Sequence, residues 1–385
     1  MSLRYPPIPI LELWLERSAH ASLDIHFTDM GPLALMLTEG TPWMPNVTFT
    51  HDHAVQLVYS RDAIKALAAH AHHWEKFLYM CPSNNNRGFR LASLLTLIPF
   101  QDATRLTYFI PMVCSSREAQ DSILNAIGRA PNLKTFYWTF PDPDYPTSRS
   151  LFPWHRLEEL NLTGCTRQLS SIIPKCTSAT RLHLDVEFYL PSQQELQPSM
   201  PLPVLKCLSI SCHRDAFLLL RQIECRNLEV LFVRLRGEEL EGFNELEDRV
   251  VQEFWEHFLV FLNSNHSLRL LQIEDMEESL IEEHMLKAFF TKTPWFTNLI
   301  GLKLTLGNAD WAYEAFDLIH SELGETENRV ADYFVVEGNF DDREEKEVVN
   351  MGWILEDDLD EFLANRSYIK KVTNLDICSF PGYEG

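Results

Sequence analysis

Residues 157–184, LEELNLTGCTRQLSSIIPKCTSATRLHL, contain the pattern on which the fold prediction depends. An apolar residue is followed three positions later by a second, and two positions after that by a third. The pattern occurs at Leu157, Leu160 and Leu162 and again at Ala179, Leu182 and Leu184. Residues two apart in a strand face the same side of a sheet. The pattern therefore predicts a strand that buries its second and third apolar residues, with the first at the turn before it.

The same pattern recurs along most of the chain. Further copies begin at Trp74, Ala103, Leu133, Leu205, Leu228, Leu268 and Leu299, with a last copy at Val372 and weaker ones at Leu23 and Val330. From Trp74 to Leu299 the intervals between copies run from 22 to 40 residues, and most lie near the roughly 20–29 residues of leucine-rich repeats. One repeat cannot bury its own apolar face, so stacked repeats should share a continuous core.

The predicted fold is therefore α/β, an irregular leucine-rich-repeat solenoid with a curved parallel sheet and helices or loops on its convex side. A compact α/β domain whose parallel strands are rich in Leu is the alternative. Helices are predicted at residues 61–73, which are Ala-rich, and at residues 118–130, 250–262 and 278–290, which have apolar residues at helical spacing.

These predicted elements divide the chain into three parts. Residues 1–73 form an N-terminal cap, residues 74–310 form the repeats, and residues 311–385 form an acidic insertion and a C-terminal cap repeat. Within the last part, residues 322–361 carry 15 Asp or Glu against three basic residues. A charged loop between the last repeats is the preferred interpretation, and an acidic arm that binds a basic partner is the alternative.

Composition limits the classes of partner. The chain of 385 residues has a formal net charge of −22, which repels nucleic acids. No segment has the roughly 18 consecutive apolar residues of a membrane span, and the N-terminus lacks the features of a signal peptide. Eight scattered cysteines without a CxxC pair indicate reduced thiols. These features predict a cytoplasmic or nuclear protein that contacts neither nucleic acid nor membrane.

Two segments resemble the fungal F-box/leucine-rich-repeat proteins. Residues 12–27, ELWLERSAHASLDIHF, are similar to the part after the F-box, where a short helix ending in LxRS leads into the first strand. Residues 67–79, LAAHAHHWEKFLY, resemble a helix-to-strand junction of that family in which Trp opens the strand, although His73 stands where Arg is usual. Later fragments such as APNLKTF, LEELNL and LPVLKCLSI also look like its repeats.

This resemblance implies a substrate receptor of a ubiquitin ligase, in which the F-box holds a Skp-type adaptor and the repeats hold the target. About ten residues precede the matching segment, and no part of the chain has the pattern of an F-box. The resemblance therefore favours target binding over ubiquitination, with a Skp-type adaptor as partner if an F-box lies outside this sequence. An interaction module unrelated to ubiquitin is the first alternative, and an enzyme on a compact α/β fold is the second.

The side chains that alternate with the apolar ones should face outward, onto the concave side of the sheet. There we expect polar residues interspersed with aromatic ones, and aromatic residues beside Arg dominate the energetics of protein interfaces. A terminal segment that folds back over this face is the alternative. The predicted partner-binding residues are Phe109, Tyr137, Asn161, Arg181, His183, Ser209, Phe232, Arg234 and Gln272, with Tyr137, His183 and Phe232 as anchors.

No catalytic, cofactor-binding or metal site is predicted. The chain lacks a Walker A loop, GxGxxG, GxSxG and HExxH. His51, His53, His70, His72 and His73 lie close in sequence, but no cysteine completes a zinc site at the usual spacing. Cys207 would lie one strand from His183 as a formal nucleophile and base, an arrangement that arises readily by chance in a stack of strands.

Overall fold

The computed structural model of the chain describes residues 7–18, 21–28, 61–80, 95, 97–112, 117–140, 152–187, 200–213, 219–220, 222–236, 256–275, 299, 301–306, 333–342 and 345–354. The chain divides into two compact units, Met1–Ala179 (unit 1) and Thr180–Gly385 (unit 2). This boundary falls inside residues 74–310, where the repeats are predicted. The division into two caps and a central repeat region stays a prediction.

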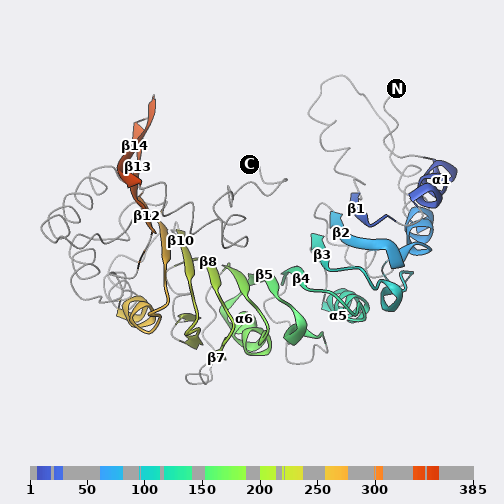
Figure 1. The fold of residues 1–385 in the computed structure, drawn as a ribbon, viewed down its shortest axis with the longest axis horizontal. Helices are drawn as coiled ribbons and strands as arrows, with labels where there is room; N and C mark the ends of the chain where they lie inside the picture. Colours follow the sequence, from blue (N-terminus) through green and yellow to red (C-terminus); the bar gives the residue numbers. More distant parts are fainter. Residues whose placement is uncertain are drawn as a thin grey trace, which may run out of the picture. The chain divides into compact units, whose positions relative to one another are not determined.

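Unit 1 contains a parallel sheet whose strands follow one another in chain order (Figure 1). Its described helices are α1 (Ile8–Ser18), α5 (Arg117–Ile127) and α6 (Thr166–Ile172), and residues 61–68 are also helical. The helices α5 and α6 lie along one side of the strands (Figure 1). The strands are β1 (Leu23–Thr28), β2 (Trp74–Met80), β3 (Tyr108–Met112), β4 (Thr135–Thr139) and β5 (Glu159–Gly164).

Unit 2 has the same arrangement up to its last strand. Its parallel strands are β6 (Arg181–Val186), β8 (Cys207–His213), β10 (Val230–Arg236), β11 (Leu270–Asp275), β12 (Gly301–Leu306) and β13 (Tyr333–Asp342). The strand β14 (Glu345–Ile354) pairs with β13 in the antiparallel sense, and β7 (Met200–Pro201) with β9 (Ile223–Glu224) forms a separate short pair. Residues 256–263 are helical.

The second and third apolar residues of the pattern are buried, as predicted, in β2, β4 and β5 of unit 1 and in β6, β8, β10, β11 and β12 of unit 2. In unit 2 they form two rows that cross β6, β8, β10, β11 and β12 in register, each residue 2% exposed or less. Burial of one such side chain stabilises a fold by about 2 kcal/mol, so these rows are a major part of the core. The rows are Leu182, Leu208, Leu231, Leu271 and Leu302, followed by Leu184, Ile210, Val233, Ile273 and Leu304.

The first apolar residue of the pattern lies in a recurring turn before the strand. Its N–H donates a hydrogen bond to the carbonyl three residues earlier, for example from Leu157 to Trp154 at 3.2 Å. Both residues of each turn are buried, so the turn fixes where each strand begins. The equivalent bonds run from Leu106 to Ala103, Ala179 to Cys176, Leu205 to Leu202, Leu228 to Cys225 and Leu268 to Asn265.

Two predictions are corrected. Residues 333–342 and 345–354 form the antiparallel strands β13 and β14 within the acidic stretch, so a simple charged loop is wrong there: apolar residues between the charges supply strand-forming segments. The copy predicted at Ala103 is displaced, because Phe109 rather than Tyr108 lies in the core.

The helix predicted at residues 118–130 is confirmed as α5, and the helix predicted at residues 61–73 is confirmed over residues 61–68. Residues 278–290 and the copy at Val372 lie outside the described residues.

Candidate functional site

The outward face of the unit 2 sheet carries three rows of side chains, which we number from the start of the strands. The first row is mostly apolar, the second alternates polar residues with an aromatic one, and the third is polar or charged. The register gives Arg181, Cys207, Val230, Leu270 and Gly301 for the first row, His183, Ser209, Phe232, Gln272 and Lys303 for the second, and Asp185, Ser211, Arg234, Glu274 and Thr305 for the third.

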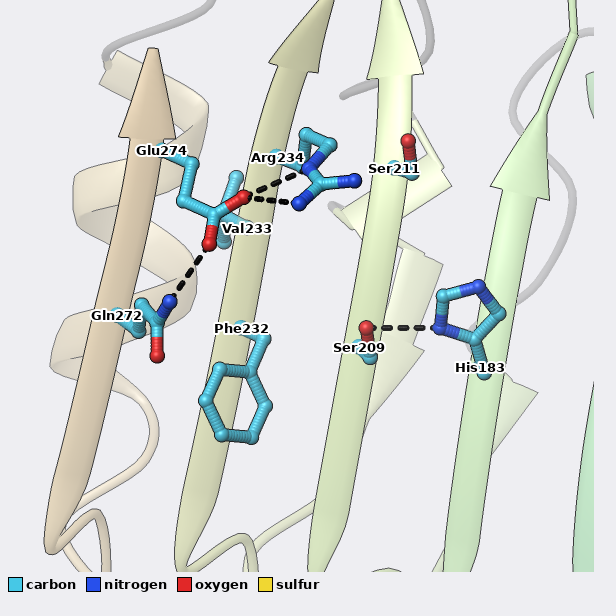
Figure 2. Close-up of a pocket in the computed structure, with 8 residues that line it drawn as sticks. All are labelled: His183, Ser209, Ser211, Phe232, Val233, Arg234, Gln272 and Glu274. Carbon is cyan, nitrogen blue, oxygen red and sulfur yellow. Dashed lines mark hydrogen bonds and ion pairs between the residues drawn. The ribbon is translucent and has the colours of Figure 1, made fainter. Parts of the chain in front are cut away.

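A shallow hollow opens between the second and third rows, on β6, β8, β10 and β11 (Figure 2). Its space, which includes open solvent, is about 310 Å³. Because this space includes open solvent, it is not comparable with the volume of a pocket that encloses a small ligand, and an open sheet does not bury most of a ligand's surface. The lining residues are His183, Ser209, Ser211, Phe232, Val233, Arg234, Gln272 and Glu274.

A hydrogen bond joins the two polar residues on one side of the hollow. The Nδ1 atom of His183 and the Oγ atom of Ser209 lie 2.8 Å apart, on neighbouring strands (Figure 2). A serine–histidine pair is the start of a nucleophilic site, but acyl transfer also requires donors for the oxyanion. Along β8 the backbone N–H groups are committed to the parallel ladders with β6 and β10. The pair therefore suits hydrogen bonding to a partner better than catalysis.

Three linked polar side chains, those of Arg234, Glu274 and Gln272, border the other side of the hollow. The Nε of Arg234 donates to Oε2 of Glu274 at 2.6 Å, and the same oxygen receives a terminal guanidinium nitrogen at 2.5 Å. The amide of Gln272 donates to Oε1 of Glu274 at 2.7 Å (Figure 2). Both carboxylate oxygens are thus engaged, and the Arg234 side chain is only 29% exposed. Two guanidinium nitrogens on one carboxylate oxygen, with Gln272 on the other, fix the orientation of these partly buried side chains.

Five of the predicted partner-binding residues meet at this hollow: His183, Ser209, Phe232, Arg234 and Gln272. Arg181 lies on the same face of β6, one row earlier. Phe232 was expected to be an exposed anchor, and that expectation is wrong because its side chain is only 5% exposed. Val230 and Leu270, which lie next to Phe232 in the adjacent first row, are also buried. Phe232 is therefore part of an apolar cluster on the outward face.

In unit 1, Tyr137 and Asn161 face outward, paired in register on β4 and β5, and both are partly exposed. The prediction for Phe109 is wrong: the side chain is fully buried, with its ring 5.4 Å from that of Phe77 and 6.4 Å from that of Phe136. Sequence reasoning missed Tyr108, which takes the outward place instead. If the apolar pattern is read from Leu106 instead of Ala103, Leu106 and Phe109 have its three-residue spacing. This reading predicts that Phe109 is buried and that Tyr108 faces outward.

The cysteines of the described residues are poor nucleophiles. Burial raises the pKa of Cys176 and of Cys225 to about 12, and burial also raises the pKa of Cys165. Cys207 is buried, and the register places it beside Arg181, whereas His183 lies beside Ser209. The formal Cys207–His183 pair is therefore not a cross-strand pair. Among the described residues no group of three His, Cys, Asp or Glu side chains could hold a metal ion, and His51 and His53 lie outside them.

These features define an α/β protein with parallel strands whose inward face is apolar and buried and whose outward face is polar in part. Neither the models of protein families nor the curated proteins contain a match to this chain. Within the described part of the chain, no helix has the length and apolar character that crossing a membrane requires.

Proposed function

We propose that this protein is a non-enzymatic scaffold that binds another protein on the outward face of its parallel sheet. The observation that carries the proposal is the alternation of burial along three neighbouring strands of the chain, whereas β8 and β10 also bury outward side chains. In β4, β5 and β6, every second side chain is buried and every other one is partly exposed and mostly polar. A parallel sheet in a compact α/β fold is covered on both faces, so its strands lack this alternation.

Recurrent bonds between successive strand-connecting segments support a leucine-rich-repeat solenoid. The Asn132 side chain donates to the carbonyl of Thr104 at 2.7 Å, and Asn227 donates to that of Pro203 at 2.6 Å. Each of these asparagines lies in the turn before a strand and reaches back to the preceding turn. Leu157, Leu160, Leu162 and Cys165 also match the repeat's consensus of three Leu and a following Cys.

The resemblance of residues 12–27 and 67–79 to the F-box/leucine-rich-repeat proteins extends the proposal to a substrate receptor of a ubiquitin ligase. The helix α1 followed by β1, and the strand β2 that begins at Trp74, have the order of elements that this resemblance implies. The test is co-purification from cells with a Skp-type adaptor. Recovery of the outward-face partner without any adaptor would favour an interaction module unrelated to ubiquitin.

The scaffold proposal is tested by selecting peptides of about 15 residues from a displayed random library against the full chain. Binding is then measured to His183→Ala and Tyr137→Ala, which shorten partly exposed outward side chains of unit 2 and unit 1. We expect at least one selected peptide to bind about tenfold more weakly to one of these variants, which corresponds to about 1.4 kcal/mol. The melting temperature should stay nearly unchanged.

Val204→Ala is the matched control, because Val204 is 42% exposed but lies in the turn before β8, away from the outward face. Selected peptides whose affinity changes in none of the outward-face variants would show that the sheet is not the binding surface.

A further inference from the structure

Two tyrosines form an accessible aromatic pair on the outward face of unit 1. Tyr108 on β3 and Tyr137 on β4 have ring centroids 5.7 Å apart, at an interplanar angle of 57°. A hydrogen bond joins their hydroxyl groups. Unlike Phe232 in unit 2, both side chains are partly exposed, so a partner can reach their rings.

A carboxylate lies beside this pair. Thr135 on β4 lies between Tyr108 and Glu159 in the cross-strand register, and its hydroxyl donates to Oε2 of Glu159 at 3.4 Å. Burial is the main cause that raises the pKa of Tyr108; a hydrogen bond with Tyr137 lowers it, the negative charge of Glu159 raises it, and the positive charge of Lys76 lowers it. The charges of Glu159 and Lys76 thus act on the Tyr108 hydroxyl in opposite directions.

The row also holds a cation beside Tyr108, but that cation already has a carboxylate partner. On the far side of Tyr108, Lys76 forms an ion pair with Asp24 at 3.0 Å, with both side chains about half exposed. The row Asp24, Lys76, Tyr108, Thr135 and Glu159 thus carries two carboxylates and one ammonium. The whole chain has a net charge of −22, which attracts basic partners over long range.

We propose that the outward face of β3–β5 binds an arginine side chain from a basic segment of the partner protein. A guanidinium group can stack on a tyrosine ring while it donates hydrogen bonds to a carboxylate such as Glu159. Arginine fits better than lysine because its planar group makes both contacts at once and is more weakly hydrated. This inference rests on the proposed function and names the partner chemistry for one part of its surface.

The test uses two synthetic peptides, acetyl-Gly-Gly-Arg-Gly-Gly-amide and the same peptide with citrulline, a neutral isostere of arginine. Their affinities for the full chain are measured by NMR titration at low ionic strength. We expect the arginine peptide to bind at least fivefold more tightly. Glu159→Gln should remove that preference, Tyr137→Ala should weaken the arginine peptide, and Tyr137→Phe should retain its binding because the aromatic face remains.

Glu158→Gln is the matched control, since it removes the same charge from an exposed neighbour that pairs with Lys134 at the start of the strand. An equal fall in both variants would show a nonspecific effect of net charge and overturn the inference. Equal affinity for the arginine and citrulline peptides would overturn it too. If library peptides still bind the outward face in that case, the scaffold proposal survives; if none does, both fail.

Discussion

At the scale of single residues, two buried thiols occupy equivalent places in the turns before strands. Cys176 lies three residues before Ala179, and Cys225 lies three residues before Leu228. Each thiol donates one weak bond, Cys176 to the Ile172 carbonyl at 3.4 Å and Cys225 to Oδ1 of Asn265 at 3.5 Å. Sulfur in these turns packs as a small apolar group, and burial disfavours its ionised form.

The stability of the fold should therefore fall in mildly alkaline solution. The pKa of each thiol rises from 9.0 to about 12 on folding, so above pH 9 the unfolded chain loses protons that the folded chain keeps. The stabilisation is complete below pH 9 and is lost as the pH rises toward 12, at up to about 1.4 kcal/mol per pH unit for each thiol. Urea unfolding between pH 8 and 10.5 measures the slope.

Cys176→Ala is the comparison for that slope. The variant should be less stable at every pH because a cavity replaces the sulfur, yet its free energy of unfolding should decline less steeply above pH 9. Parallel curves for the variant and the wild type would mean that the thiol ionises equally in both states.

At the scale of elements, the C-terminal end of α5 is capped by a residue from the next turn of the chain. The guanidinium of Arg156 donates to the carbonyls of Gly128 at 3.0 Å, Ala130 at 3.1 Å and Pro131 at 3.4 Å. These carbonyls follow the end of the helix, where the helix dipole also favours a cation. One side chain thus joins a helix to the turn that begins the following strand.

Replacement of Arg156, even by lysine, should lower the free energy of unfolding. Arg156→Met should lower the free energy of unfolding by about 2 kcal/mol, because hydrogen bonds from a charged donor are lost. Arg156→Lys keeps the charge but lacks the planar fork, so it should recover less than half of that loss. Chemical denaturation measures both values. Full recovery by lysine would show that charge alone stabilises the end of the helix.

The strand β3 shows how much of the fold and site the sequence could predict. The apolar spacing correctly predicted the buried rows of unit 2 and the strand face on which the five residues around the hollow lie, since their alternation has one consistent frame. Around β3 two frames fit, and the copy from Ala103 contains a plausible Tyr108 as its third apolar residue. Only packing against Phe77 and Phe136 selects the frame with Phe109 inside, and such contacts between distant segments are absent from a local pattern.

Alanine substitutions in the two neighbouring aromatic residues test this register directly. Phe109→Ala should destabilise the protein by about 3–5 kcal/mol, because it removes a fully buried ring from a stack of aromatic side chains. Tyr108→Ala should cost clearly less, since that side chain is partly exposed on the outward face. Thermal or urea unfolding of both variants gives the comparison, and a larger loss for Tyr108→Ala would contradict the register.

The burial of Phe232 has a similar origin. Its place on the outward face follows from strand alternation, but its 5% exposure does not. Val230 lies two residues earlier on the same strand, but Leu270 lies on β11 and comes beside Val230 only through the parallel register. A prediction made strand by strand therefore finds which face a side chain occupies, but not how far its neighbours cover it.

At the scale of the whole molecule, the excess of acidic residues acts on folding as well as on binding. With 55 acidic against 33 basic residues, the folded chain holds like charges closer together than the unfolded chain does. This self-repulsion destabilises the compact state, and salt reduces it by screening. We therefore expect the melting temperature at pH 7 to rise by a few degrees when sodium chloride is increased from about 20 mM to about 500 mM.

The same experiment near pH 5 separates charge repulsion from other effects of salt. The sequence has an isoelectric point of about 5.0, so the net charge and the self-repulsion nearly vanish there. Screening should then raise the melting temperature little or not at all, whereas a general strengthening of apolar burial by salt would act equally at both pH values. An equal rise at pH 5 and pH 7 would show that the net charge of −22 does not limit the stability of the fold.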